Sequence, residues 1–337
     1  MKKILNVHEP LSATYSHTAN TLAIIGDEEG VDPWLMNCFI QIFGSNEVFL
    51  DYQDFGFMEC PIIHSQHIGL DLVKEGWKHI TEFVKKAIQL EYYVYAELNV
   101  SKIKAFNLKW PFAHDVLIYG FDDETEEYFI ADFFNGKKYT FTRVSYKEIE
   151  DAFSYDASIF GRTGIFFDDI FLLKPKDDKN AIFSVDKVKD SLTLYLEEKP
   201  MIYGFNRFKP YNVKEVQDYY YGIGCYNIFF NIIEKTKENR LLPNRWRQII
   251  HLMYEHKKIM GIRLKYMNVR NYLSNSHAYI DEYKLIEEKM FKVRNLFLKY
   301  SLSGKEHTLE SIKENLLCVR DMERNVIPSI LKDIMVV

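Results

Sequence analysis

The spacing of apolar residues along the chain changes near residue 175, from a mixture of strand and helix patterns to helix patterns alone. Residues 67–90 carry apolar side chains at intervals of three and four, which predicts one long amphipathic helix. Runs of β-branched and aromatic residues bounded by turn residues predict strands. These runs fall at 92–98, 113–121, 128–132, 138–142 and 164–173.

Capping residues predict shorter helices in the first half of the chain. A short apolar stretch indicates a helix over 16–27. Asp32 followed by Pro33 is an N-cap before a proline at the first helical position, so we expect a second helix from there to about residue 43. Ser145 and Glu148 have the spacing of a capping box and predict a helix to about residue 153.

The charged stretch 174–180 contains a proline and predicts a linker between domains. Helical periodicity follows it, with Ser184 and Asn244 as expected N-caps and Gly304 as a break between the last two helices. The expected helices are 184–198, 213–236, 244–271, 276–301 and 308–334. We therefore expect an α+β domain over residues 1–176 and an all-helical domain over residues 181–337.

The composition suits two globular domains, because 337 residues that are 47% hydrophobic and 15% aromatic can bury sizeable cores. No apolar run approaches the ~20 residues of a membrane span, and the N-terminus lacks the apolar core of a secretory signal. The 4 cysteines are scattered without paired spacing, which argues against a disulfide framework and suits a reducing compartment. We therefore expect a cytoplasmic protein that does not bind a membrane.

The net charge of -5 divides unequally along the chain. Residues 1–176 carry 16 Lys and Arg against 27 Asp and Glu, a net of -11, and the remainder carries a net of +6. This basic surplus is too small and too dispersed for nucleic-acid binding, and it suits an acidic protein partner. The sequence has no glycine-rich phosphate loop or dinucleotide fingerprint, so we expect no nucleotide cofactor.

The main candidate for chemistry is the pair His114 and Asp132. These residues flank an acidic turn centred on Asp123, so a hairpin would place them opposite or nearly opposite each other. A carboxylate that orients a histidine forms two members of a nucleophilic triad. A weaker alternative is a metal site at Cys60, His64 and His67, for which the sequence offers no fourth ligand.

The order of a helix followed by a His-then-Asp hairpin resembles the papain-like fold of the double-glycine peptidases that process bacteriocins. The resemblance is closer to the N-terminal domains of butirosin-biosynthesis protein H-like acyltransferases found in nonribosomal peptide and other antibiotic gene clusters. The similar segments are Tyr15–Ala23, Val31–Leu35, Tyr221–Tyr226 and Leu252–Met260. The resemblance implies a papain-like first domain that moves acyl groups from carrier-protein thioesters.

The sequence departs from that family where the family has its nucleophile. The family places a cysteine at the start of the first helix, where the helix dipole lowers a thiol pKa, and this chain has Ser16 and His17 there. Ser16 can act as a weak nucleophile if His114 activates it, and neutral His17 can act as a base. Cys38 is the substitute thiol, although a cysteine in the middle of a helix is more often a small buried hydrophobic residue.

Three hypotheses follow from these residues and the resemblance. The first is amide formation from a carrier-protein thioester and a small amine, with His114 as general base and Asp132 holding its tautomer. The second is a catalytically inactive papain-like scaffold that binds a pathway product or partner. The third is a Cys38-dependent acyltransferase or peptidase. None of the three requires a metal or cofactor, and a homodimer is possible in each.

Overall fold

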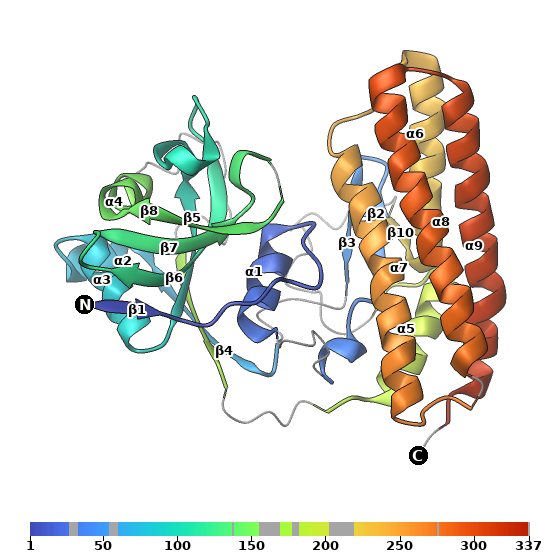
Figure 1. Cartoon of the computed structure of the whole chain (residues 1–337), viewed down its shortest axis with the longest axis horizontal. Helices are drawn as coiled ribbons and strands as arrows, with labels where there is room; N and C mark the ends of the chain where they lie inside the picture. The colour runs from blue at the N-terminus through green and yellow to red at the C-terminus, as the bar shows by residue number, and fades with distance from the viewer. Residues whose placement is uncertain are drawn as a thin grey trace. The chain divides into compact units, whose positions relative to one another are not determined.

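The structure is a computed structural model, and it describes residues 1–26, 33–53, 60–136, 138–154, 169–176, 182–201, 219–274 and 276–335. The fold is α+β, with antiparallel sheets followed by a helical C-terminal region (Figure 1). The chain forms two compact units. Unit 1 comprises residues 1–30 and 56–180, and unit 2 comprises residues 31–55 and 181–337.

Unit 1 is built on one antiparallel sheet with the strand order β4-β9-β5-β6-β7-β8, and β1 pairs with the far end of β6. Its strands are β1 (Lys2–Ile4), β4 (Ile63–Gly69), β5 (Tyr93–Asn99), β6 (Ala113–Asp122), β7 (Glu127–Asp132), β8 (Thr140–Ser145) and β9 (Asp169–Pro175). Its helices are α1 (Ser16–Ile25), α2 (Leu70–Gly76), α3 (Ile80–Gln89) and α4 (Tyr146–Phe153), with short 3-10 turns η2 (Val100–Lys102), η3 (Lys104–Phe106) and η4 (Phe134–Gly136).

The core of unit 1 lies between one face of this sheet and helices α3 and α4. Buried apolar residues of α3, such as Val84 and Ile88, pack against Val116 and Ile118 of β6 in this core. Helix α1 contacts β6 and β7, and its buried Asn20 accepts a hydrogen bond from the hydroxyl of Tyr139 at 2.7 Å.

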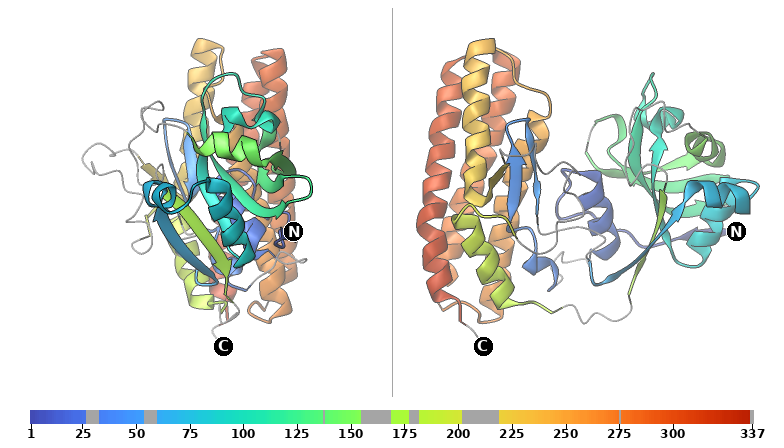
Figure 2. Two further views of the ribbon diagram at one scale, coloured as in Figure 1. Left: turned by 90° about the vertical axis from the view of Figure 1, so that its left-hand side faces the viewer. Right: turned by 180° about the vertical axis from the view of Figure 1, so that it is seen from behind.

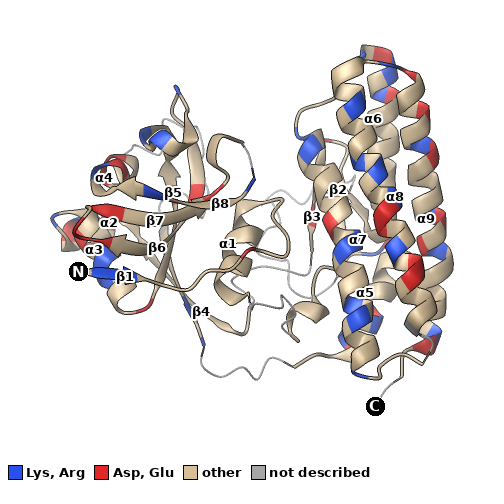
Figure 3. Ribbon diagram, in the orientation of Figure 1, with Lys and Arg blue, Asp and Glu red and all other residues tan. Residues whose placement is uncertain are grey.

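Unit 2 combines long helices with a small sheet. Its helices are α5 (Val185–Leu196), α6 (Tyr226–Asn239), α7 (Trp246–Val269), α8 (Ser276–Ser303) and α9 (His307–Asp333), with 3-10 turns η1 (Leu35–Asn37) and η6 (Gly222–Cys225). Helix α8 packs against both α7 and α9, while α5 and α6 pack on α9. The sheet has the strand order β10-β2-β3, formed by β10 (Tyr219–Tyr221), β2 (Ile42–Ser45) and β3 (Phe49–Tyr52). Figure 3 shows both basic and acidic residues on the helices of unit 2.

The expected domain boundaries need one correction. A division of the chain does fall in the predicted linker, but residues 31–55 belong to unit 2 and not to the first domain. The reason is that β2 pairs with β10, so a hairpin from the first half of the chain lies beside the helices of the second half (Figure 2). Unit 2 is therefore not all-helical, as the apolar pattern had predicted.

The helix expected over 33–43 is also wrong. The chain forms only the turn η1 there, Phe39 takes a left-handed φ of 63°, and β2 begins at Ile42. Side chains distant in sequence satisfy the backbone carbonyls that a helix would have used: Arg263 donates to the carbonyl oxygens of Met36 and Cys38. Tertiary hydrogen bonds thus override the local helix signal. Asp32, the expected N-cap, lies outside the described residues.

Two further helices are shorter than expected. The segment 67–90 begins as β4, which pairs with β9, and it continues as two helices, α2 and α3. The segment 213–236 contains β10 and η6 before α6 begins, and residues 213–218 lie outside the described part.

Asn244 does not cap α7, because the N-cap position is Arg245 in a left-handed conformation. The helices α4, α5, α8 and α9 lie where the pattern predicted them, with the capping box of Ser145 and the Ser184 cap both formed.

Gly222 is expected to be intolerant of any side chain. Its φ is +52°, and a Cβ there would lie 2.2 Å from the carbonyl oxygen of Tyr195. Gly222→Ala should lower the free energy of unfolding by about 2 kcal/mol or more, because αL strain and a clash with rigid backbone add together. Gly304→Ala is the matched control, since Gly304 has φ +62° with nothing within 4 Å. Urea unfolding should show a smaller loss for Gly304→Ala, and equal losses would contradict the clash.

No described helix has both the length and the apolar character needed to cross a bilayer.

Candidate functional site

His114 and Asp132 form a hydrogen-bonded pair at the end of the β6–β7 hairpin. Nδ1 of His114 lies 2.8 Å from Oδ2 of Asp132. The carboxylate is completely buried, while the imidazole is 30% exposed. The contact predicted from the acidic turn is therefore present, with the carboxylate inside the unit and the ring at its surface.

The register of the hairpin differs from the predicted one, because the pair nearest the turn is Asp122 with Glu127 and the turn is therefore centred beyond Asp123. Leu117 pairs with Ala131 and Ile118 with Ile130, but the pairing then shifts so that Gly120 opposes Phe129. The extra residue in β6 brings His114 closer to Asp132: the register before the shift would place Asp132 opposite Leu117, whereas the shifted register places it level with Val116, two residues from His114. The two side chains meet diagonally on the same face of the sheet, within the reach of such neighbours.

Two hydrogen bonds fix the carboxylate of Asp132. Oδ2 faces the imidazole, and Oδ1 accepts from the backbone N–H of Phe133 at 2.6 Å. Because Asp132 occupies Nδ1 of His114, Nε2 is the ring nitrogen that can exchange a proton with a substrate. This is the arrangement in which a carboxylate sets the tautomer of a catalytic histidine.

The charges around the ring favour its protonated form. Burial lowers the pKa of His114, but the hydrogen bond and charge of Asp132, together with the nearby Asp115, outweigh it and raise the pKa to about 9. Burial raises the pKa of Asp132, and the hydrogen bond from His114 opposes that effect without cancelling it. At neutral pH the pair therefore carries a proton on the imidazole.

Aromatic rings form the walls around His114. The ring of Phe112 stacks on it at 5.9 Å between centroids, and Phe106 lies 6.3 Å away. The buried Asn99 holds this region together, because its Oδ1 accepts hydrogen bonds from the backbone N–H groups of Ser101 and Phe112, at 3.3 Å each. The imidazole thus sits in a partly apolar environment with a fixed orientation.

Ser16 does not join the pair. Its hydroxyl donates to Oδ2 of Asp115 at 3.1 Å. Asp115 follows His114 in β6, and neighbouring residues of a strand point to opposite faces. The serine therefore lies on the other side of the sheet from the imidazole, and the expectation that His114 activates it is wrong.

The other two nucleophile or base candidates, His17 and Cys38, belong to different units of the chain. The ring of His17 stacks on Tyr15 at 5.6 Å, and within the described residues no hydrogen bond or ring contact joins it to His114. Cys38 belongs to unit 2, where it is completely buried and its thiol lies 3.7 Å from the carbonyl oxygen of Trp34. Its burial agrees with a structural thiol, although it ends the turn η1 and not the middle of a helix.

The metal alternative fails on geometry. His64 and His67 lie in β4, where three residues of separation place side chains on opposite faces. Nε2 of His64 instead lies 2.8 Å from the Gln66 amide. Across the described residues, no three His, Cys, Asp or Glu side chains are close enough together to hold a metal ion.

Three residues of the site were not predicted from the sequence. Asp115 lies next to His114, and strand alternation would have placed it on the opposite face near α1. Phe112 approaches the imidazole, and Asn99 binds the backbone of Phe112, because the chain between β5 and β6 folds back, which local patterns do not encode. No protein-family model and no curated protein matches the chain.

Proposed function

We propose that this protein transfers an acyl group from a thioester to an amine, with His114 as the group that moves the proton. The observation that carries the proposal is the His114–Asp132 pair itself: a buried carboxylate bound to a partly exposed imidazole at 2.8 Å. Such a pair can act as general base without a covalent intermediate, because a thioester is already activated toward an amine.

In the proposed reaction the amine nitrogen attacks the thioester carbonyl carbon. A C–N bond forms, the C–S bond breaks, and Nε2 of His114 takes the proton that the amine nitrogen loses. The same nitrogen then returns this proton to the departing thiolate, so the products are an amide and a free thiol. Asp132 stabilises the imidazolium between these two steps.

The proposal also covers the substrates of the reaction and the protein family that the sequence resembles. The acyl donor would be an acyl or peptidyl carrier protein, the acceptor a small amine, and the setting a cytoplasmic pathway for a specialised metabolite. The papain-like resemblance supports this choice, because α1 precedes a sheet that carries the His and Asp on neighbouring strands. The lack of contact between His114 and Ser16 or His17 within unit 1 supports direct aminolysis over a covalent acyl-enzyme.

The test is aminolysis of an acyl-pantetheine thioester by a primary amine. A colorimetric thiol assay measures the release of the thiol, and mass spectrometry identifies the amide. His114→Ala should reduce the rate about 10²- to 10⁴-fold, the usual contribution of general acid–base catalysis. Asp132→Asn should also slow the reaction, because the imidazole loses its orienting carboxylate. His17→Ala is the matched control and should leave the rate unchanged. An unchanged rate in His114→Ala would remove the proposed role.

A binding role without turnover is the second candidate. The observation that favours it is that Asp115, and not His114, holds the hydroxyl of Ser16. In that case the wild-type protein would catalyse no aminolysis, and a small molecule that copurifies with it would raise its unfolding temperature.

A further inference from the structure

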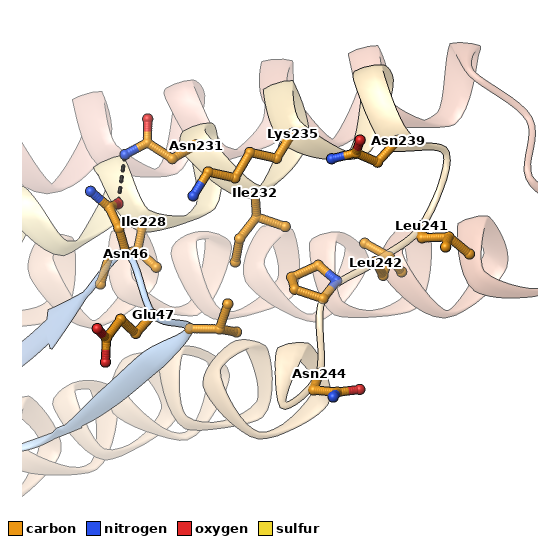
Figure 4. Close-up of a pocket in the computed structure, with 12 residues that line it drawn as sticks. Asn46, Glu47, Ile228, Asn231, Ile232, Lys235, Asn239, Leu241, Leu242 and Asn244 are labelled. Carbon is orange, nitrogen blue, oxygen red and sulfur yellow. Dashed lines mark hydrogen bonds between the residues drawn. The ribbon is translucent and has the colours of Figure 1, made fainter.

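Unit 2 contains a pocket that is formed by residues of that unit alone. It lies between the β2–β3 turn, helix α6 and the connection from α6 to α7, and its volume is about 460 Å³ (Figure 4). This volume lies within the range of small-molecule sites. The inference drawn from it does not rest on acyl transfer, because none of its residues belongs to the His114 site.

The base of the pocket is aliphatic. Ile228 and Ile232 of α6 are buried, and Val48 and Leu242 approach from the two adjoining turns. Figure 4 shows Ile228 and Ile232 on the helix and Leu242 on the connection that follows it. A ligand that fits this surface therefore needs an apolar part.

The polar groups of the pocket lie along α6 and at the β2–β3 turn. The amide of Asn231 donates to Oδ1 of Asn46 at 2.7 Å and to the hydroxyl of Tyr220 at 3.3 Å, which fixes one end of the pocket. Lys235 and Asn239 follow at four-residue intervals, so they share a face of the helix with Asn231.

Lys235 is the cationic group of the pocket. Within the described residues no carboxylate oxygen lies within ion-pair distance of its ammonium group, whereas its neighbour Glu234 pairs with Lys313 and Lys237 pairs with Glu310. Figure 4 shows the Lys235 side chain extending over the pocket toward Asn46, while the carboxylate of Glu47 is turned away from the aliphatic base. The pocket thus offers a positive charge and amide groups above an apolar surface.

The backbone around the pocket is strained. Val48 has a φ of 61°, a region that β-branched residues rarely adopt. Arg240 and Arg245, at the two ends of the α6–α7 connection, have φ values of 57° and 65°. Strained residues of this kind gather at ligand sites, where the surrounding fold imposes the conformation.

We infer that this pocket binds a small monocarboxylate with an aliphatic tail. The carboxylate accepts a hydrogen bond from the ammonium group of Lys235, and the tail lies on Ile232, Val48 and Leu242. The charge of Lys235 selects the anion, and the apolar area sets the preferred length of the tail.

The experiment is a titration of the full-length 15N-labelled protein with sodium hexanoate, followed through the side-chain amide signals of Asn46, Asn231 and Asn239. These signals should shift together and saturate at millimolar concentrations. Butyrate should bind roughly tenfold more weakly, because each buried methylene contributes about 0.8 kcal/mol. Hexylamine should bind at least about tenfold more weakly than hexanoate, because it lacks the anion.

Lys235→Met tests the charge while it keeps the length of the side chain. The affinity for hexanoate should fall at least about tenfold. Lys299→Met removes an exposed lysine of α8 outside the pocket and should change nothing. The inference would be overturned by an unchanged affinity in Lys235→Met, by amide signals that do not shift, or by leucine binding more tightly than 4-methylpentanoate. The last result would mean that the pocket recognises an ammonium group.

Discussion

Glu323→Gln should lower the free energy of unfolding of unit 2 by about 3–5 kcal/mol, the usual cost of breaking a buried ion pair. The carboxylate of Glu323 lies 2.9 Å from the ammonium group of Lys257, and both side chains have no exposed surface. Three tyrosines donate their hydroxyls to the same carboxylate: Tyr226 at 2.7 Å, Tyr195 at 3.1 Å and Tyr283 at 3.3 Å. The variant keeps the shape of the side chain but leaves Lys257 without a counter-charge.

The loss should depend on pH. Burial lowers the pKa of Lys257, and Glu323 partly restores it. Without the carboxylate the folded protein holds this proton less tightly still, so the unfolded state binds more protons and stability rises with pH. The difference between wild type and Glu323→Gln should therefore shrink as the pH is raised toward the ordinary range of a lysine.

Urea unfolding, followed by circular dichroism at several pH values, measures this effect. The double variant Lys257→Met with Glu323→Gln should recover part of the loss, because it removes both charges and keeps an oxygen acceptor for the tyrosine hydroxyls. Glu234→Gln is the control for an exposed pair. Glu234 is half exposed and contacts Lys313 at 2.7 Å, so the cost should stay below about 1 kcal/mol. Equal losses in Glu234→Gln and Glu323→Gln would show that burial does not govern the contribution of the pair.

The helices of this network were predictable from the sequence, but the ion pair between them was not. The periodicity of α7 and α9 placed both helices correctly, since apolar spacing reports which face of a helix is buried. Lys257 and Glu323 are charged residues, which are almost never fully buried unless paired, and their pairing depends on the contact between distant helices. Lys257 lies four residues after Met253 and three before Met260, so the spacing places it on the buried face of α7. Glu323 has the same place between Val319 and Val326 of α9, but the spacing does not show that the two charged residues pair.

The His114–Asp132 contact was predictable because a hairpin is a local structure. The acidic turn and the flanking strands predict which residues come together to within two positions along the strand. The relation of Ser16 to the pair was not predictable in this way. Whether α1 meets the sheet on the face of His114 or on that of Asp115 depends on packing across 99 residues of sequence.

The hairpin of β2 and β3, by contrast, was not predicted, although it is also a local structure. Asp32 and Pro33 are a strong helix-start signal, yet the chain from Leu35 onward forms a short turn and a strand. The buried Arg263 and His256 of α7 bind the carbonyl oxygens of Met36 and Ile40, respectively, and these contacts exist only once the long helices are in place. A helix propensity of a few tenths of a kcal/mol per residue is smaller than the stabilisation that such buried hydrogen bonds provide.

The imidazole of His114 should titrate at about pH 9 in the folded protein. Its pKa should fall toward its ordinary value of about 6.5 in Asp132→Asn, because Asp115 is then the carboxylate that remains to oppose the effect of burial. Titration of the histidine ring signals by NMR measures both values, and His114→Ala identifies the signal. Asp115→Asn is the matched control on the opposite face of β6, and it should lower the pKa by less than Asp132→Asn does.

The same titration governs stability and the proposed chemistry. A folded-state pKa above the unfolded value means that the folded protein binds the proton more tightly between about pH 6.5 and pH 9. The stabilisation from protonated His114 is therefore fully present below pH 6.5 and is lost as the pH rises through 9, by about 3 kcal/mol in total.

The rate of aminolysis should change in the opposite direction, because the neutral imidazole is the base. The rate should therefore rise with pH up to about 9. Asp132→Asn should move this rise to lower pH while lowering the maximum rate. The proposed role of the pair would be contradicted if His114 of the wild-type protein titrated near pH 6.5. It would also be contradicted if the pH dependence of the aminolysis rate were the same in wild type and Asp132→Asn.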